Sequence, residues 1–228
     1  MLEKGQDDKT TPSVEPKEDR EMVLLAVQQN GEALYHASAK LKDDAEVVLA
    51  AVRQVGEALR HASAERKNDT VVMLAAVQQN GKALYYASAE LKRDRKVVLA
   101  AVQQNGHALH HASTGLKRDH GVVLAAVQQN GGALEYASAE LRQDPTVVLA
   151  AVRQVGEALR HASTELQNDP KVVLVAVQQN HKALYYVSAE LKRDPEVVLG
   201  GGLWNCDDLT SLLPRARKTT IARKRARA

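Results

Sequence analysis

The chain has 228 residues, a formal net charge of +3 and 44% hydrophobic residues, with no Phe, one Trp and one Cys. The single cysteine excludes a disulfide within the chain, and no apolar run approaches the roughly 18 residues that a membrane-spanning helix needs. The first residues contain no apolar run typical of a secretion signal, so we expect an intracellular protein of the cytoplasm or nucleus, with no membrane span.

The chain begins with a polar segment and continues as a long repeat. Residues 1–18 contain two prolines and scattered charges, and we expect a disordered leader there. From Asp19 the sequence repeats every 25 residues, through seven whole units and an eighth that stops after Leu199. Single units of this kind cannot cover their own apolar face, so neighbours must stack. We therefore predict an all-α solenoid of two-helix repeats over residues 19–199.

Each unit is predicted to begin with a capped helix of about ten residues. An Asp opens every unit, and an Asp side chain accepts hydrogen bonds from free N–H groups of the first turn. Pro145, Pro170 and Pro195 follow this Asp at the first helical position, where a missing N–H does no harm. The helix is expected to stop at a glycine in the left-handed conformation. These glycines are Gly31, Gly56, Gly81, Gly106, Gly131 and Gly156, and His181 is expected to strain or shift the cap in the seventh unit.

A core of small aliphatic residues follows from the columns of the repeat. Val48, Ala51 and Val52 share one face of the first helix, and we place Leu49 beside them. The second helix contributes Ala58, Leu59 and Ala62.

A serine fills the same place in all seven units, as Ser63 does in the second. It either caps a final short turn or lies inside a helix with its hydroxyl bonded to a carbonyl.

Residues 200–228 depart from the repeat. Three glycines form a linker, and Trp204 is a candidate plug for a cap built from residues 203–213. The last fourteen residues carry seven basic side chains and no acidic one, which leaves about −4 for the other 214 residues. This tail is interpreted as a nuclear-import signal, an anion-binding segment for phosphate or membrane, or a solubilising end. Its basic residues are Arg215, Arg217, Lys218, Arg223, Lys224, Arg225 and Arg227.

The histidines do not have the spacing of a metal or catalytic site. One column holds only His or Tyr, from His36 to Tyr186, and is interpreted as a ladder of half-buried rings. Residues at the same place in adjacent stacked helices lie about 8–10 Å apart, whereas zinc ligands lie about 2.0–2.1 Å from the metal. We predict no catalytic residue, no metal and no cofactor.

Two columns of the second helix vary between units while the core stays constant. Variation beside a fixed core predicts a solvent-facing surface, and solenoids commonly bind proteins on such a face. We therefore predict a protein partner of unknown identity there; the alternative is a solvated surface without a partner. The candidate partner-binding residues are Tyr35, Arg60, Lys82, Tyr85, His107, His110, Glu135, Arg160, Lys182 and Tyr185.

The repeat Asp-Pro-Glu-Val-Val-Leu-Ala-Ala-Val-Gln-Gln-Asn-Gly resembles the domain-of-unknown-function family numbered forty-one-sixteen, over residues 19–199. The resemblance implies an α-helical tandem array, and it carries over no catalytic residue. We predict a non-enzymatic scaffold for protein–protein interaction. The alternative is a module that makes weak contact with nucleic acid through the basic tail.

Overall fold

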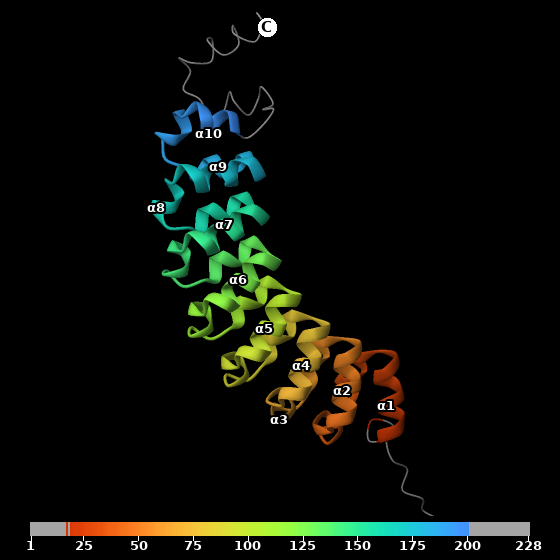
Figure 1. Cartoon of the computed structure of the whole chain (residues 1–228). Coiled ribbons are helices and arrows are strands. Elements are labelled where there is room, and N and C mark those ends of the chain that lie inside the picture. The colour runs from red at the N-terminus through yellow and green to blue at the C-terminus, as the bar shows by residue number, and fades with distance from the viewer. Residues whose placement is uncertain (1–16, 18, 201–228) are drawn as a thin grey trace, which may run out of the picture. The chain divides into compact units, whose positions relative to one another are not determined.

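The computed structural model describes residue 17 and residues 19–200 of the chain (Figure 1). The chain divides into two compact units, Met1–Ser138 and Ala139–Ala228. In both units the described residues form helices and no strand. The predicted leader (residues 1–18, apart from residue 17), Trp204, Cys206 and the basic tail lie outside the described residues.

Each repeat consists of an α-helix, a six-residue 3-10 helix and a short final turn. In the first unit the α-helices are α1 (Arg20–Gln29), α2 (Ala45–Gln54), α3 (Ala64–Lys67), α4 (Thr70–Gln79), α5 (Arg95–Gln104) and α6 (His120–Gln129). The 3-10 helices there are η1 (Gly31–His36), η2 (Leu41–Asp43), η3 (Gly56–His61), η4 (Gly81–Tyr86), η5 (Leu91–Arg93), η6 (Gly106–His111), η7 (Leu116–Arg118) and η8 (Gly131–Tyr136).

The second unit repeats the same order of elements. Its α-helices are α7 (Pro145–Gln154), α8 (Thr164–Gln167), α9 (Pro170–Gln179) and α10 (Pro195–Gly200). Its 3-10 helices are η9 (Leu141–Gln143), η10 (Gly156–His161), η11 (His181–Tyr186) and η12 (Leu191–Arg193).

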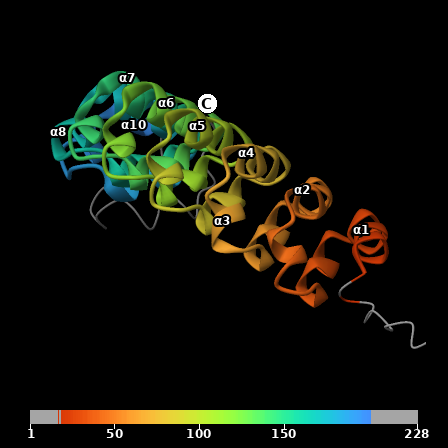
Figure 2. The same cartoon turned by 90° about the horizontal axis from the view of Figure 1, so that it is seen from below.

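Within the first unit, successive ten-residue helices lie side by side, from α1 through α2, α4 and α5 to α6 (Figures 1 and 2). In the second unit α7, α9 and α10 follow one another in the same manner. The 3-10 helices form a second layer, in which η1, η3, η4, η6 and η8 pack in order. The predicted solenoid of tandem helical repeats is therefore confirmed within each unit.

The predicted aspartate caps are confirmed. Asp44 Oδ1 accepts hydrogen bonds from the backbone N–H groups of Glu46 at 2.9 Å and Val47 at 3.1 Å. The serine column also forms caps, because Ser63 Oγ accepts from Arg66 N at 3.1 Å. The Ser63 N–H in turn donates to the carbonyl of Lys42 in the preceding repeat at 2.9 Å. The serine thus joins the end of one repeat to the end of the next.

The glycine that follows each first helix has a different role from the one predicted. Each ten-residue α-helix ends two residues before this position, at a Gln, and its C-cap is an extended Asn or Val rather than a left-handed glycine. A Cβ on Gly106 would lie 2.4 Å from the carbonyl oxygen of Ala126 in the next repeat. The prediction of a left-handed cap is therefore wrong. Glycine suits this position at Gly31, Gly56, Gly81, Gly106 and Gly156 because the backbone of the next repeat approaches so closely there.

A glutamine reinforces this approach in alternate repeats. Gln129 Oε1 accepts from the Gly106 N–H at 2.5 Å, and its Nε2 donates to the Gln104 carbonyl at 3.3 Å. Gln79 and Gln179 make the same pair of bonds in their repeats. His181 begins η11 at the same place where glycine begins the other six-residue helices.

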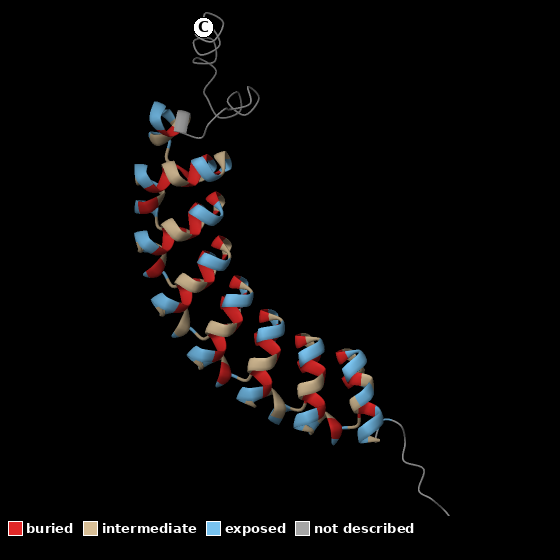
Figure 3. Cartoon of the chain, turned by 45° about the vertical axis from the view of Figure 1, so that its right-hand side comes forward, coloured by how far each residue is buried: buried red, intermediate tan, exposed pale blue. Residues whose placement is uncertain are grey.

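The core lies between the stacked helices, where Figure 3 shows buried residues along their facing sides. Val48, Ala51, Val52 and Leu59 have no exposed surface, as the columns predicted. Leu49 is only half-buried, so its assignment to the core is wrong. The leucine column instead lies at the outer edge of the layer of α-helices. Neighbouring α-helices cover each other's facing sides, but no other described element covers the side that points away from the 3-10 helices.

Candidate interaction surface

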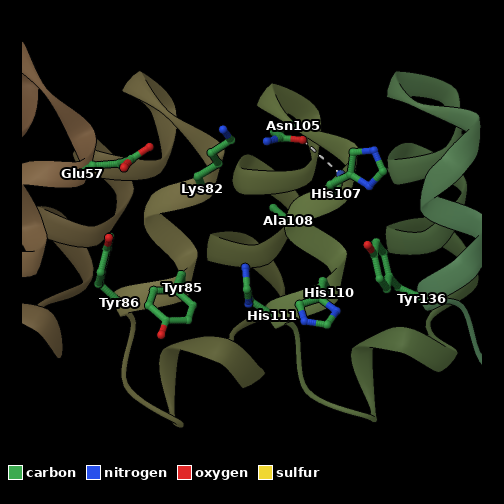
Figure 4. A pocket seen from close by; sticks show the side chains of 10 residues that line it. All are labelled: Glu57, Lys82, Tyr85, Tyr86, Asn105, His107, Ala108, His110, His111 and Tyr136. Carbon is green, nitrogen blue, oxygen red and sulfur yellow. Dashed lines mark hydrogen bonds between the residues drawn. The ribbon is translucent and has the colours of Figure 1, made fainter.

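The variable positions of the repeat lie on the exposed side of the six-residue 3-10 helices. A 3-10 helix has about three residues per turn, so side chains at i and i+3 lie one above the other. His107 and His110 are arranged in this way in Figure 4. All the residues predicted to bind a partner are exposed: Tyr35, Arg60, Lys82, Tyr85, His107, His110 and Glu135 in the first unit, and Arg160, Lys182 and Tyr185 in the second. We call the surface that they form in each unit the variable face.

Aromatic rings connect successive repeats along the variable face of the first unit. Tyr35 packs edge-on against His61 of the next repeat, with ring centroids 5.1 Å apart, and Tyr85 meets His111 at the same distance. His110 continues the series to Tyr136 at 4.8 Å. Such edge-to-face pairs stabilise a structure beyond their burial. The predicted ladder is therefore corrected: the rings of the His/Tyr column are half-buried apart from the exposed His36, and His61, His111 and Tyr136 each contact a ring of the variable column in the preceding repeat.

A column of lysines lies along the ring ladder. Lys42 Nζ lies 5.7 Å from the centre of the Tyr35 ring, and Lys92 Nζ lies 5.9 Å from that of Tyr85. Lys92 Nζ also donates to the backbone carbonyl of Tyr85 at 2.8 Å. The tyrosines are therefore held between a ring of the next repeat and an ammonium group.

A carboxylate lies on the variable face between the first and second repeats. Arg60 Nη2 donates to Glu32 Oε2 at 2.6 Å, and Arg60 Nε donates to His61 Nε2 at 2.8 Å. Glu32 Oε2 lies 3.2 Å from His61 Nε2. The side chains at these three positions therefore form one charged cluster.

The third to fifth repeats form an open hollow of about 340 Å3 on the same face (Figure 4). Lys82 and His107 lie along one edge, and Tyr85, His111 and His110 lie along the other. One carboxylate, that of Glu57, also lines the hollow, and it accepts from the Asn80 side-chain amide at 2.9 Å.

Burial and nearby basic groups both act on His111. Partial burial lowers the pKa of His111 below its usual value, and the charges of His110, Lys92 and Lys117 lower it further. Burial also lowers the pKa of the Lys117 ammonium. The causes acting on His111 include no carboxylate. A negatively charged ligand beside His111 would relieve this repulsion.

The second unit repeats part of this geometry. Arg160 Nε donates to His161 Nε2 at 2.7 Å, as Arg60 does to His61. Lys192 Nζ donates to the Tyr185 carbonyl at 3.4 Å, in the manner of Lys92 and Tyr85. Each unit therefore presents one exposed tyrosine with a lysine ammonium bonded to its backbone.

A second hollow lies between the α-helices α2 and α4, away from the variable face. It is lined by Leu49, Leu74, Ala75 and Val71 among others, and Val71 is 64% exposed. The sequence columns did not reveal this surface, because the leucines were assigned to the core. The signal in the sequence is the column of leucines that is the same in every repeat, because the facing helices do not have enough surface to cover it as well as the valine and alanine columns.

Among the described residues, no three His, Cys, Asp or Glu side chains form a group that could hold a metal ion. Within the same part of the chain, no helix has the length and apolar character needed to cross a bilayer. The seven basic residues of the tail, from Arg215 to Arg227, lie outside the described residues.

The family model described as Domain of unknown function (DUF4116) matches the chain four times in tandem, at residues 19–67, 72–117, 119–167 and 144–192. Each match spans about two of the 25-residue repeats. No curated protein and no solved structure matches the chain.

Proposed function

We propose, for a chain that belongs to the DUF4116 family, that the repeat array is a non-enzymatic scaffold that binds a protein partner through its variable face. The observation that carries the proposal is the contrast between two sets of positions. The core columns keep the same small aliphatic residues, whereas the exposed columns of the 3-10 helices change from repeat to repeat. A stacked array with a continuous exposed face is a common protein-binding surface.

The side chains of the variable face suit a protein partner. Three tyrosines are largely exposed, Tyr35 at 60%, Tyr85 at 58% and Tyr185 at 60%. Tyrosine is enriched among residues that dominate binding energy, because it offers a large area and a polar tip. The Tyr85 ring lies between the Lys92 ammonium, 5.9 Å from its centre, and the ring of His111, so the side chain would lose little freedom on binding.

The absence of catalysis is part of the proposal, and the packing of the imidazoles supports it. His61 and His111 each lie against a tyrosine ring of the preceding repeat. These contacts give both imidazoles a structural role in the ladder. A general base, by contrast, needs a ring nitrogen within hydrogen-bond distance of the substrate proton that it removes.

The proposal is tested by selecting linear peptides from a random display library against the immobilised full chain. We expect Tyr85→Ala and Tyr185→Ala each to weaken the selected peptides, and the double variant to weaken them further. Val71→Ala is the matched control, because it shortens an exposed apolar side chain on α4, outside the variable face. Helicity, followed by circular dichroism, should be the same in all variants.

Unchanged peptide binding by the double variant would contradict the proposal. The nucleic-acid alternative has its own signature, a steep salt dependence of oligonucleotide binding that disappears when residues 200–228 are removed. Turnover of a substrate that is lost in His111→Ala would contradict the non-enzymatic part.

A further inference from the structure

Two pairs of rings on the variable face of the first unit, which we call the earlier and the later place, have the same arrangement but neighbours of opposite charge. Residues 50 positions apart correspond, so Tyr35 and His61 in the first two repeats match Tyr85 and His111 in the third and fourth. The two ring pairs have the same centroid distance of 5.1 Å. The group that lies against the earlier ring pair therefore indicates what kind of group the later ring pair can bind.

At the earlier place the framework holds a carboxylate. The Glu32 side chain lies between Arg60 and His61, at 2.6 and 3.2 Å. At the later place the position of Glu32 is taken by Lys82, and the position of Arg60 by His110. The internal carboxylate has been replaced by a cation.

The charged and titratable groups around the later place are predominantly basic. His110 and Tyr85 lie against His111, with ring centroids at 4.9 and 5.1 Å. Lys92 in η5 and Lys117 in η7 both act on His111 through their charges. The remaining acidic group of the hollow is Glu57, one repeat further back, where Asn80 binds it.

We infer that this place, bounded by Lys82, Tyr85, His110 and His111, binds the carboxylate of an Asp or Glu side chain in an extended segment of the protein partner. The inference rests on the proposed function and names the chemistry that the partner brings. The partner's carboxylate lies between Lys82 and the imidazoles of His110 and His111, and the Lys82 ammonium is its fully charged donor, as the Arg60 guanidinium is for Glu32 two repeats earlier. The ring of Tyr85 covers the methylene groups of the same side chain.

The structure favours a carboxylate of a peptide over a nucleic-acid phosphate. The occupant seen within the chain is the carboxylate of Glu32, and it lies 3.2 Å from His61 Nε2, whose ring packs edge-on against Tyr35. The rings of the ladder contact one another edge-to-face, so they do not present parallel faces on which successive bases would stack.

Binding should strengthen as the pH falls from 8 to 6. A carboxylate stabilises the protonated form of an imidazole, so protonation of His111 and binding of the ligand favour each other. The carboxylates of a glutamate peptide stay ionised over this range, because their pKa lies near 4.3.

The test uses the full chain and fluorescein-labelled hexaglutamate, with hexaglutamine and oligothymidine as comparison probes, by fluorescence anisotropy at pH 6 and 8. We expect hexaglutamate to bind more tightly than either comparison probe, and more tightly at pH 6. Lys82→Glu should weaken hexaglutamate at least about tenfold, the effect of losing a charged hydrogen bond and gaining a repulsive charge. Lys96→Glu, the same charge change in the first turn of α5, should have little effect.

Two further measurements use the earlier place as a template. Lys82→Glu supplies an internal carboxylate, so the pKa of His111 measured by NMR should rise. The reverse change, Glu32→Lys, should open a second site and raise the number of hexaglutamate molecules bound. Equal binding by the parent and Lys82→Glu, with no change at His111, would overturn the inference.

The outcomes separate the inference from the proposed function. If displayed peptides bind in a Tyr85-dependent manner but hexaglutamate binds no better than hexaglutamine, the scaffold proposal stands and the carboxylate site fails. If oligothymidine binds more tightly than hexaglutamate and Lys82→Glu abolishes this, the site accepts nucleic acid and the inference is wrong. If neither displayed peptides nor hexaglutamate bind, both fail.

Discussion

Replacing Gly106 with Ala probes the closest backbone contact between two repeats. The added Cβ would lie 2.4 Å from the Ala126 carbonyl oxygen, about 1 Å inside an ordinary contact, so the repeats must move apart. The movement also disturbs the bond from Gly106 N–H to Gln129 Oε1, now 2.5 Å. An overpacked contact costs about 1–3 kcal/mol and a lost hydrogen bond about 0.5–1.5 kcal/mol, so we expect the free energy of unfolding to fall by about 2–4 kcal/mol.

Urea unfolding of the full chain, followed by circular dichroism at 222 nm, measures this loss. Gly115→Ala is the matched control nine residues later. Gly115 has right-handed helical angles, φ −61° and ψ −44°, and its added Cβ would meet nothing closer than 4.0 Å. That change should stabilise the protein by about 0.4–1 kcal/mol through the unfolded state. A Gly106→Ala protein as stable as the parent, or equal losses from both changes, would refute the close-approach argument.

Three further predictions concern the core, the caps and acid. Leu109→Ala, at a fully buried position, should lower the free energy of unfolding in urea by about 2–5 kcal/mol, whereas Tyr85→Ala, at a position 58% exposed, should lower it far less. Equal losses would contradict the assignment of Leu109 to the core and Tyr85 to the surface. Asp94→Ala should cost about 1 kcal/mol in the same assay as a lost cap, and no loss would contradict the capping role. The hydrogen bond from Arg95 lowers the pKa of Asp119, so this carboxylate contributes stability above its unfolded pKa of about 3.9 and loses it as the pH falls through the lower folded value. Thermal unfolding between pH 5 and 2 should show a smaller acid loss in Asp119→Asn than in the parent, and identical profiles would contradict the assignment.

Much of the candidate site was visible in the sequence. Variation beside a fixed core was enough to predict which side chains face solvent, because burial restricts volume and exposure does not. The basic environment of His111 was missed, since Lys92 and Lys117 come from a different part of the repeat. The sequence did contain one sign of the site, because Lys82 stands 50 residues after Glu32, at the equivalent position with the opposite charge.

The sequence by itself determined the repeat, the caps and most of the core. Asp44 caps its helix through atoms two and three residues away, and Val48 and Val52 share a face because of the helical period. Such features depend on local geometry, so the order of residue types is sufficient to specify them.

Only the tertiary structure decided the features that depend on how two repeats stack. The role of Gly106 depends on a carbonyl 20 residues away, and the half-burial of Leu49 depends on how much of its side the next helix covers. The 3-10 form of the second helix likewise sets Lys82 beside Tyr85 and aims both at the same hollow. These outcomes are set by distances between repeats, and such distances result from the packing of all the core side chains together rather than from any single segment.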